Sequence, residues 1–156
     1  MLLADLIASG QVTVSVEWIA VSAITSDRRV NTRPVDSTWV DKKVKEGFDD
    51  SRLGVPIVSR RADGTHVWLD GQNRGELIRR VGWGDQKIQC RVFTGLSLAQ
   101  EASLFLGHND NRQVKAHHKF MARITEGEPT AVSINRIVEA EGWKVSDWPG
   151  TNGIKA

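Results

Sequence analysis

The sequence predicts an α+β protein, with a small mixed β-sheet, packed helices and a helical C-terminal part. Four stretches in the first two thirds of the chain are rich in β-branched and other apolar residues, and breaks that contain Gly, Pro or Asp separate them. They lie near residues 13–24, 55–60, 65–70 and 86–93. From residue 97 onward, apolar residues recur at helical spacing instead. We therefore expect the strands before residue 97 and mainly helices after it.

Length and composition indicate a domain that folds without metals or disulfides. A chain of 156 residues suits one domain with a small addition, and about 70% of its unfolded surface is buried on folding. Cys90 is the only cysteine, which excludes an intramolecular disulfide and fits a reducing compartment. The sequence starts without a basic leader, and no run approaches the ~20 apolar residues of a membrane span. We expect a soluble, cytoplasmic protein without membrane association.

Charge is distributed unevenly along the chain, although the net charge is only +2. From Arg60 to Arg91 there are seven basic residues against four acidic ones, whereas after Thr125 five acids outweigh three bases. The positive potential is therefore expected in the middle of the chain, where it favours an anionic ligand.

The central feature is a break inside residues 67–80, where a short apolar run ends and helical spacing begins. Leu77, Ile78 and Val81 fall on one side of the predicted helix, and Arg74, Arg79 and Arg80 point away from it. A strand that turns through Gly into a helix presents backbone N–H groups that favour an anion, and Arg74 adds a charge there. Gly71–Arg74 is either a phosphate-binding turn or a joint in which Gly71 only supplies a positive φ. Spacing alone favours neither.

Capping residues mark two helices on either side of this turn. Asp36 is placed to cap a helix that ends near Gly47. The inward side of this helix is expected to carry Trp39, Val40 and Val44. Ser97 and Gln100 have the spacing of a capping box, which predicts that another helix begins there.

Three features refine the predicted strands. Residues 12–24 predict one strand or two. Asp63 and Gly64 accept the positive φ of a tight primed turn, which predicts a hairpin between the second and third stretches. Cys90 is expected to pack as a small apolar residue in the last strand.

The C-terminal third is predicted from apolar spacing and terminators. Residues 107–112 form a cluster too polar for a core. Helices are expected near 114–125 and 130–141, the second with Ile134, Ile137 and Val138 directed inward. The tail from residue 143 contains Pro and Gly and is expected to be partly loose.

Several of these segments together resemble the ParB/sulfiredoxin superfamily, the nucleotide-binding domain of partition proteins and their phage relatives. The segments are Gly54-Val55-Pro56-Ile57-Val58, Asp63-Gly64, Leu69-Asp70-Gly71-Gln72-Asn73-Arg74, Glu101-Ala102 and Asn109-Asp110-Asn111-Arg112. The resemblance covers about residues 16–125, and these segments in series are fairly specific. The third segment resembles the D-G-x-H-R form of many phage and actinobacterial members.

The resemblance implies a nucleoside triphosphate ligand, CTP or ATP. It assigns phosphate and nucleotide binding to Asp70, Gly71, Gln72, Asn73, Arg74, Asn109 and Arg112. In the partition proteins a Glu-Asn pair holds Mg²⁺, and here His108 replaces the acid. Asn109 and Asp110 are therefore the candidate Mg²⁺ ligands, since oxygen suits this ion and imidazole does not. Without the resemblance, residues 108–112 would be interpreted as a polar turn between helices.

The superfamily also contains enzymes. Sulfiredoxin activity is excluded, because Gln72 stands where the catalytic cysteine is needed and cannot act as a thiolate. A kinase would need a general base, for which Asp70 or Glu76 is available, although Asp70 is better interpreted as a cap of the turn. A nuclease would need a metal site. His108, Asp110, His117 and His118 are the candidate ligands, but the adjacent pair His117 and His118 face different sides of a helix.

DNA binding is predicted for the helix that begins near residue 112. Arg112, Lys115, Lys119 and Arg123 recur at spacings of three, four and four and share one face, opposite Phe120, Met121 and Ile124. The alternative is an ordinary solvated face of an amphipathic helix.

We thus expect a nucleotide-binding domain over residues 1–112 and a helical extension over 113–156. The expected function is that of a ParB-like, nucleotide-dependent DNA-binding or regulatory protein of phage or mobile-element type, with a second copy of the chain as a candidate partner. The alternatives are a metal-dependent nuclease, nucleotide hydrolase or kinase on the same scaffold, and a domain that keeps the fold but has lost its ligand.

Overall fold

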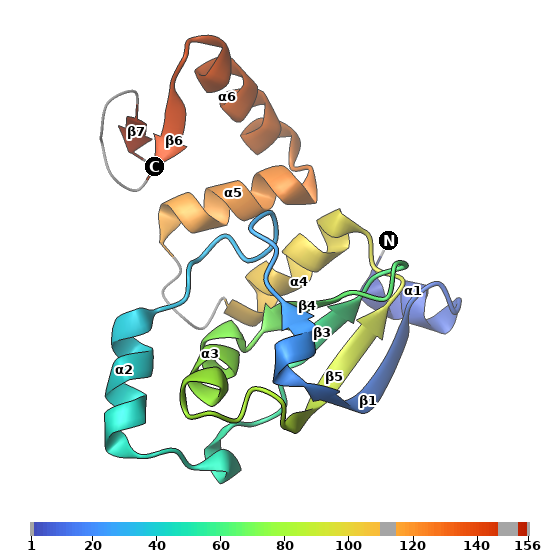
Figure 1. The fold of residues 1–156 in the computed structure, drawn as a ribbon. Coiled ribbons are helices and arrows are strands. Elements are labelled where there is room, and N and C mark those ends of the chain that lie inside the picture. Colours follow the sequence, from blue (N-terminus) through green and yellow to red (C-terminus); the bar gives the residue numbers. More distant parts are fainter. Residues whose placement is uncertain (1, 110–114, 147–152, 156) are drawn as a thin grey trace. The chain divides into compact units, whose positions relative to one another are not determined.

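The computed structural model describes residues 2–109, 115–146 and 153–155, and it confirms the α+β class (Figure 1). The chain divides into two compact units. The sheet unit comprises Met1–Asp27 and Pro34–Leu96, and the helical unit comprises Arg28–Arg33 and Ser97–Ala156. The domain boundary expected after residue 112 falls outside the described residues and stays a prediction.

Five strands in the order β1-β5-β3-β4-β2 form the sheet of the first unit. Their bounds are β1 (Thr13–Ala20), β2 (Ile24–Thr25), β3 (Ile57–Arg60), β4 (His66–Asp70) and β5 (Lys87–Thr94). β5 pairs antiparallel with β1 and parallel with β3, whereas β4 pairs antiparallel with β3 and parallel with β2, so the sheet is mixed as predicted. Residues 12–24 give two strands, because the 3-10 helix η1 (Val21–Ala23) interrupts them and sends β1 and β2 to opposite edges.

The sheet unit also contains α1 (Leu3–Ala8), α2 (Ser37–Glu46), α3 (Gln72–Arg80) and the 3-10 helix η2 (Asp50–Arg52). Its core contains Ile19, Val21, Ile24, Val58, Trp68, Ile78, Cys90 and Val92. Cys90 is fully buried, as predicted. A Cβ atom on Gly75 of α3 would lie 2.6 Å from Cζ2 of Trp68, so only glycine lets the helix approach this ring so closely.

Helix α2 begins as predicted but has a narrower apolar side. The N–H of Trp39 donates to Oδ1 of Asp36 at 2.9 Å, so Asp36 is the cap. Val40 is fully buried, whereas Val44, expected inward, is 38% exposed. Val40 and Val44 lie on the same side of the helix, one turn apart, so this side is covered at Val40 and less covered at Val44.

The hairpin between β3 and β4 forms, but its turn differs from the predicted one. The N–H of Gly64 donates to the carbonyl of Arg61 at 2.9 Å, and the N–H of Arg61 donates to the carbonyl of Thr65 at 2.9 Å. The turn is therefore centred on residues 62 and 63, and Gly64 follows it with a φ of 84°. A longer loop of this kind replaces the tight two-residue primed turn.

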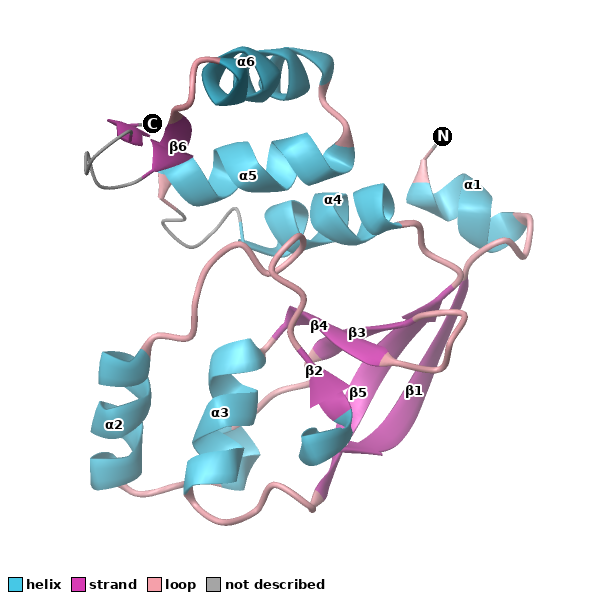
Figure 2. Ribbon diagram, turned by 45° about the horizontal axis from the view of Figure 1, so that its top comes forward, coloured by secondary structure: helices cyan, strands magenta, loops and turns pink. Residues whose placement is uncertain are grey.

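The helical unit contains α4 (Leu98–Asn109), α5 (Ala116–Glu126) and α6 (Pro129–Ala140), followed by the short parallel strands β6 (Lys144–Ser146) and β7 (Gly153–Lys155) (Figure 2). The capping box of α4 is confirmed. The N–H of Ser97 donates to Oε1 of Gln100 at 2.8 Å, and the N–H of Gln100 donates to Oγ of Ser97 at 3.2 Å. The tail, expected to be partly loose, supplies the two strands. In the described part of the chain, no helix has the length and apolar character needed to cross a membrane.

The apolar side of α6 corrects a prediction. Ile134 and Ile137, expected inward, are 43% and 64% exposed, and Val138 is half-buried. Ala131 in the first turn is the buried residue of this helix. α6 therefore has the amphipathic spacing that was predicted, but its Ile side chains lie on a surface.

Candidate phosphate-binding turn

The turn that joins β4 to α3 needs a glycine. Gly71 has a φ of 107° and is the N-cap of α3. A Cβ atom at this position would lie 2.9 Å from Cβ of Pro56 and 3.1 Å from Nη2 of Arg74, so a side chain would be both strained and crowded. Because glycine has no side chain to accept from the first N–H groups of the helix, this helix start keeps donors that suit an anion.

Arg74, which was expected to point away from the apolar side of α3 and to add a charge at the turn, folds back onto the turn. Its Nη2 lies 2.7 Å from Oδ2 of Asp70, and its Nη1 donates to the carbonyl of Leu53. The side chain is only 18% exposed. The role expected for Asp70 as a cap is wrong, because its carboxylate pairs with Arg74 and the N-cap is Gly71. Arg74 thus already ties α3 to the segment before β3.

One N–H group of the Arg74 guanidinium has no hydrogen-bond partner among the described residues. This group, at Nε, is buried. Buried donors are nearly always satisfied, so an unpaired one indicates a missing ligand oxygen or water. A phosphate oxygen is one group that would satisfy it, and the turn therefore fits the phosphate expected there.

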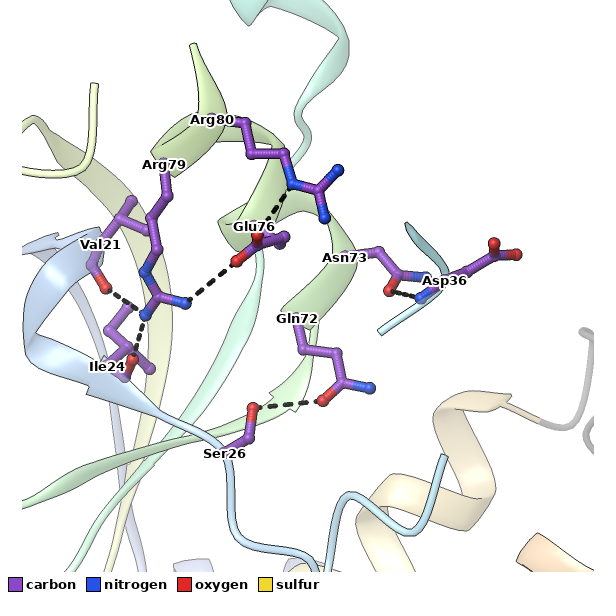
Figure 3. A network of polar contacts seen from close by, with 9 residues as sticks. All are labelled: Val21, Ile24, Ser26, Asp36, Gln72, Asn73, Glu76, Arg79 and Arg80. Atoms are coloured by element: carbon purple, nitrogen blue, oxygen red, sulfur yellow. Dashed lines mark hydrogen bonds and ion pairs between the residues drawn. The ribbon is translucent and has the colours of Figure 1, made fainter. Parts of the chain in front are cut away.

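Gln72 and Asn73, which follow Gly71 at the start of α3, bond to parts of the chain that are distant in sequence (Figure 3). Oε1 of Gln72 accepts from Oγ of Ser26 at 3.2 Å, and Oδ1 of Asn73 accepts from the N–H of Asp36 at 2.9 Å. Sequence analysis missed Ser26, Leu53 and Asp36 as neighbours of the turn. No signal marked them, because contacts over such separations leave no local spacing pattern.

The remaining polar residues of α3 are also bonded to their surroundings (Figure 3). Nη2 of Arg79 donates to the carbonyls of Val21 and Ile24 at 3.2 and 2.8 Å. Arg80 donates to Oε1 of Glu76 at 3.0 Å and pairs with Asp41 of α2. These side chains fasten η1, β2 and α2 to the helix, so Arg79 and Arg80 are engaged in the fold.

Ion pairs neutralise most of the basic side chains in the middle of the chain. Five of the seven basic residues form ion pairs within the sheet unit: Arg60 with Glu17, Arg61 with Asp27, Arg74 with Asp70, and Arg79 and Arg80 with Glu76. Lys87 and Arg91 have no carboxylate within ion-pair distance among the described residues. The excess of positive charge is thus concentrated on β5.

Thiol chemistry is disfavoured on electrostatic grounds as well. Burial raises the pKa of the Cys90 thiol to about 11, so the nucleophilic thiolate is scarce at neutral pH. Cys90 acts as a core residue.

The other predicted site residues belong to the helical unit. Asn109 ends α4, while Asp110 and Arg112 lie outside the described residues, so their predicted roles in nucleotide and Mg²⁺ binding stay predictions. Lys115 is the N-cap of α5, and the helix carries Lys119, half-buried, and Arg123, exposed.

His117 and His118 of α5 were expected to face different sides of the helix, but their ring centroids lie only 5.5 Å apart, at an interplanar angle of 54°. His118 is 8% exposed, and Oγ1 of Thr32 donates to its backbone carbonyl at 2.9 Å. Within residues 2–109, 115–146 and 153–155, no three His, Cys, Asp or Glu side chains gather as metal ligands.

Comparisons with known proteins agree with this fold. Two solved structures of a pNOB8-like ParB N-domain match the chain. One is 14% identical with a TM-score of 0.51, over 83% of this chain and 45% of that one. The other, in the C2221 form, is 16% identical with a TM-score of 0.50, over 83% and 49%. The predicted ParB-like fold is confirmed, and the chain spans about half the length of these structures.

Sequence comparison gives a family but no activity. No protein of curated function matches the chain. A family model described as "Family of unknown function (DUF6551)" matches residues 26–147. Because this match spans most of the sequence, the chain belongs to the family of unknown function DUF6551.

Proposed function

We propose that this chain is a ParB-like, nucleotide-dependent DNA-binding or regulatory protein whose turn at residues 70–74 binds the phosphates of a nucleoside triphosphate, CTP or ATP. The observation that carries the proposal is the buried, unpartnered Nε of Arg74 beside a helix start capped by glycine. The ParB-like fold supports it, because in the partition proteins that the chain resembles the corresponding turn lies against the triphosphate of CTP.

Gly71 and Arg74 have separate parts in the proposed binding. Gly71 lets the phosphate approach the backbone, and the N–H groups at the start of α3 donate to it. Arg74 supplies a charge-assisted hydrogen bond in competition with Asp70. Asn109 and Arg112, with Asp110 for Mg²⁺, keep the roles that the resemblance implies for them, as part of the proposal. If Mg²⁺ binds, it supplies charge neutralisation of the phosphates.

The test is a measurement of labelled CTP, ATP and GTP binding, with and without Mg²⁺. Arg74→Ala is expected to weaken binding about tenfold or more, because it removes a charge-assisted hydrogen bond. Asp70→Asn is expected to strengthen binding, because it releases the guanidinium from its ion pair. Arg80→Ala is the matched control: it removes the same charge from the same helix, away from the turn, and is expected to bind as the wild type does.

Since Arg74 also holds the fold together, each variant's melting temperature is recorded without nucleotide, and the shift on adding nucleotide is compared. If wild type binds none of the three nucleotides, or if Arg74→Ala and Arg80→Ala bind equally well, the phosphate assignment is wrong.

DNA binding is assigned in the same proposal to Lys115, Lys119 and Arg123, through contacts to phosphates more than to bases. Each lost contact is expected to flatten the dependence of log K on log salt by about 0.9 for duplex DNA. Titrations of wild type and of Lys119→Ala/Arg123→Ala at several salt concentrations measure this slope. Lys42→Ala/Lys45→Ala on α2 is the control of equal charge. Equal slopes for all three proteins would contradict the assignment to α5.

A further inference from the structure

One face of the sheet unit carries an exposed tryptophan between cations. β1 and β5 pair antiparallel along their whole length, with Val16 opposite Arg91, Trp18 opposite Gln89 and Ala20 opposite Lys87. Residues directly opposite each other in such a pair lie on the same face of the sheet. Trp18 is 65% and Val16 60% exposed, and Lys87, Gln89 and Arg91 are exposed as well. We call these five residues the β1–β5 face.

The opposite side of the same two strands is an ordinary core. There Ile19, Cys90 and Val92 are buried. The one acid of β1, Glu17, is opposite Cys90 and pairs with Arg60, so it belongs to that side. The burial pattern of the strands therefore accounts for one side and leaves the exposed tryptophan on the other unexplained.

Charge on the β1–β5 face has one sign. Lys87 and Arg91 are the two basic residues of the central region without an ion pair in the described part of the chain. The guanidinium of Arg91 lies 5.2 Å from the ring centroid of Phe93, which holds it at the sheet. Asp85, the acid before β5, accepts from Oγ of Ser22 at 3.1 Å. The face thus suits an anionic partner with flat apolar groups.

We propose that the β1–β5 face binds single-stranded nucleic acid. An unpaired base stacks on Trp18, Lys87 and Arg91 contact the flanking phosphates, and the amide of Gln89 is placed to hydrogen-bond a base edge. Exposed aromatic rings and cations on an open strand surface recognise unpaired bases, because a duplex hides the faces of its bases. A second copy stacked face to face is disfavoured, since it would bring the same cations together. The proposal does not depend on nucleotide binding at the turn.

The experiment is a fluorescence-anisotropy titration of the full chain with labelled oligothymidylate at several salt concentrations, without added nucleotide. Trp18→Ala is expected to weaken binding about tenfold, and Trp18→Phe much less, because a phenyl ring still stacks. Trp83→Ala is the matched control, since Trp83 is 47% exposed but packs edge-on against Phe48 elsewhere in the unit. It is expected to bind as wild type.

The charged residues have their own readout. Lys87→Ala/Arg91→Ala is expected to flatten the dependence of log K on log salt by about 0.7 for each lost phosphate contact, the value for single strands. Melting temperatures of all variants check that the fold is unchanged. Arg74→Ala is expected to retain oligothymidylate binding, and Trp18→Ala to retain nucleotide binding, so that failure of one proposal does not resemble failure of the other.

Three results would overturn the inference. The first is that wild type does not bind oligothymidylate at low salt, and the second is that Trp18→Ala binds it as tightly as wild type. The third is a concentration-dependent dimer of the wild type that Trp18→Ala abolishes while neither protein binds oligothymidylate. That result would assign the face to a second copy of the chain.

Discussion

Helix α3 of the sheet unit and helix α6 of the helical unit have apolar residues at similar helical spacing, but their surroundings differ. In α3, Leu77 and Ile78 are 7% and 1% exposed. In α6, Ile134 and Ile137 are 43% and 64% exposed. Helical spacing therefore identified both helices, whereas only tertiary packing determined whether the apolar side is covered.

The two helices also differ on their polar sides. In α3 the polar residues Gln72, Asn73, Arg74, Glu76, Arg79 and Arg80 bond to loops, carbonyls or other side chains. In α6, Glu128 accepts from the N–H groups of Thr130 and Ala131 at the start of the helix. A helix that is held on both sides acts as a scaffold, so the candidate phosphate turn at the start of α3 stands on a rigid element.

The largest expected effect on stability comes from truncating one isoleucine in α3 and one in α6, which tests whether the two helices differ in how their apolar sides are covered. Ile78→Ala leaves a cavity in the core and is expected to reduce the free energy of unfolding by about 2–5 kcal/mol. Ile137→Ala removes an exposed side chain and is expected to change it by less than about 0.5 kcal/mol. Urea unfolding followed by circular dichroism measures both. A loss above about 1 kcal/mol for Ile137→Ala would break the comparison, because it would mean that the side of α6 is covered in solution.

A smaller effect is expected from adding a methyl group at a helical glycine. Gly75→Ala brings Cβ within 2.6 Å of the buried Trp68 ring and is expected to destabilise the protein by about 1–3 kcal/mol through overpacking. Gly107→Ala in α4 is the control, because nothing lies within 4 Å of its Cβ position. It is expected to stabilise by about 0.5–1 kcal/mol. If Gly75→Ala were neutral under the same unfolding conditions, α3 would not be packed tightly on β4.

Charge shows a second limit of sequence reasoning. The count of seven basic residues against four acidic ones predicted a positive middle, and that prediction placed the potential at the turn. Side-chain pairing cancels most of it there and leaves Lys87 and Arg91 on β5. A charge count is additive along the chain, but ion pairs depend on which residues the fold brings together, and these were as distant as Glu17 and Arg60.

The sequence by itself determined the elements whose causes are local. Asp36 and the Ser97–Gln100 box begin helices because a side-chain oxygen satisfies nearby N–H groups. Gly71 bends the chain from strand to helix because its positive φ excludes other residues. The motif order was enough to indicate the ParB-like fold.

Only the tertiary structure decided what depends on residues far apart in the chain. It placed β1 and β2 at opposite edges of one sheet, turned Arg74 onto Asp70 and Leu53, and exposed Ile137 and Trp18. The physical reason is that burial and pairing are properties of the whole packing arrangement. The spacing of a residue along a helix or strand gives the direction of its side chain. Whether a neighbour lies in that direction depends on which distant elements pack there.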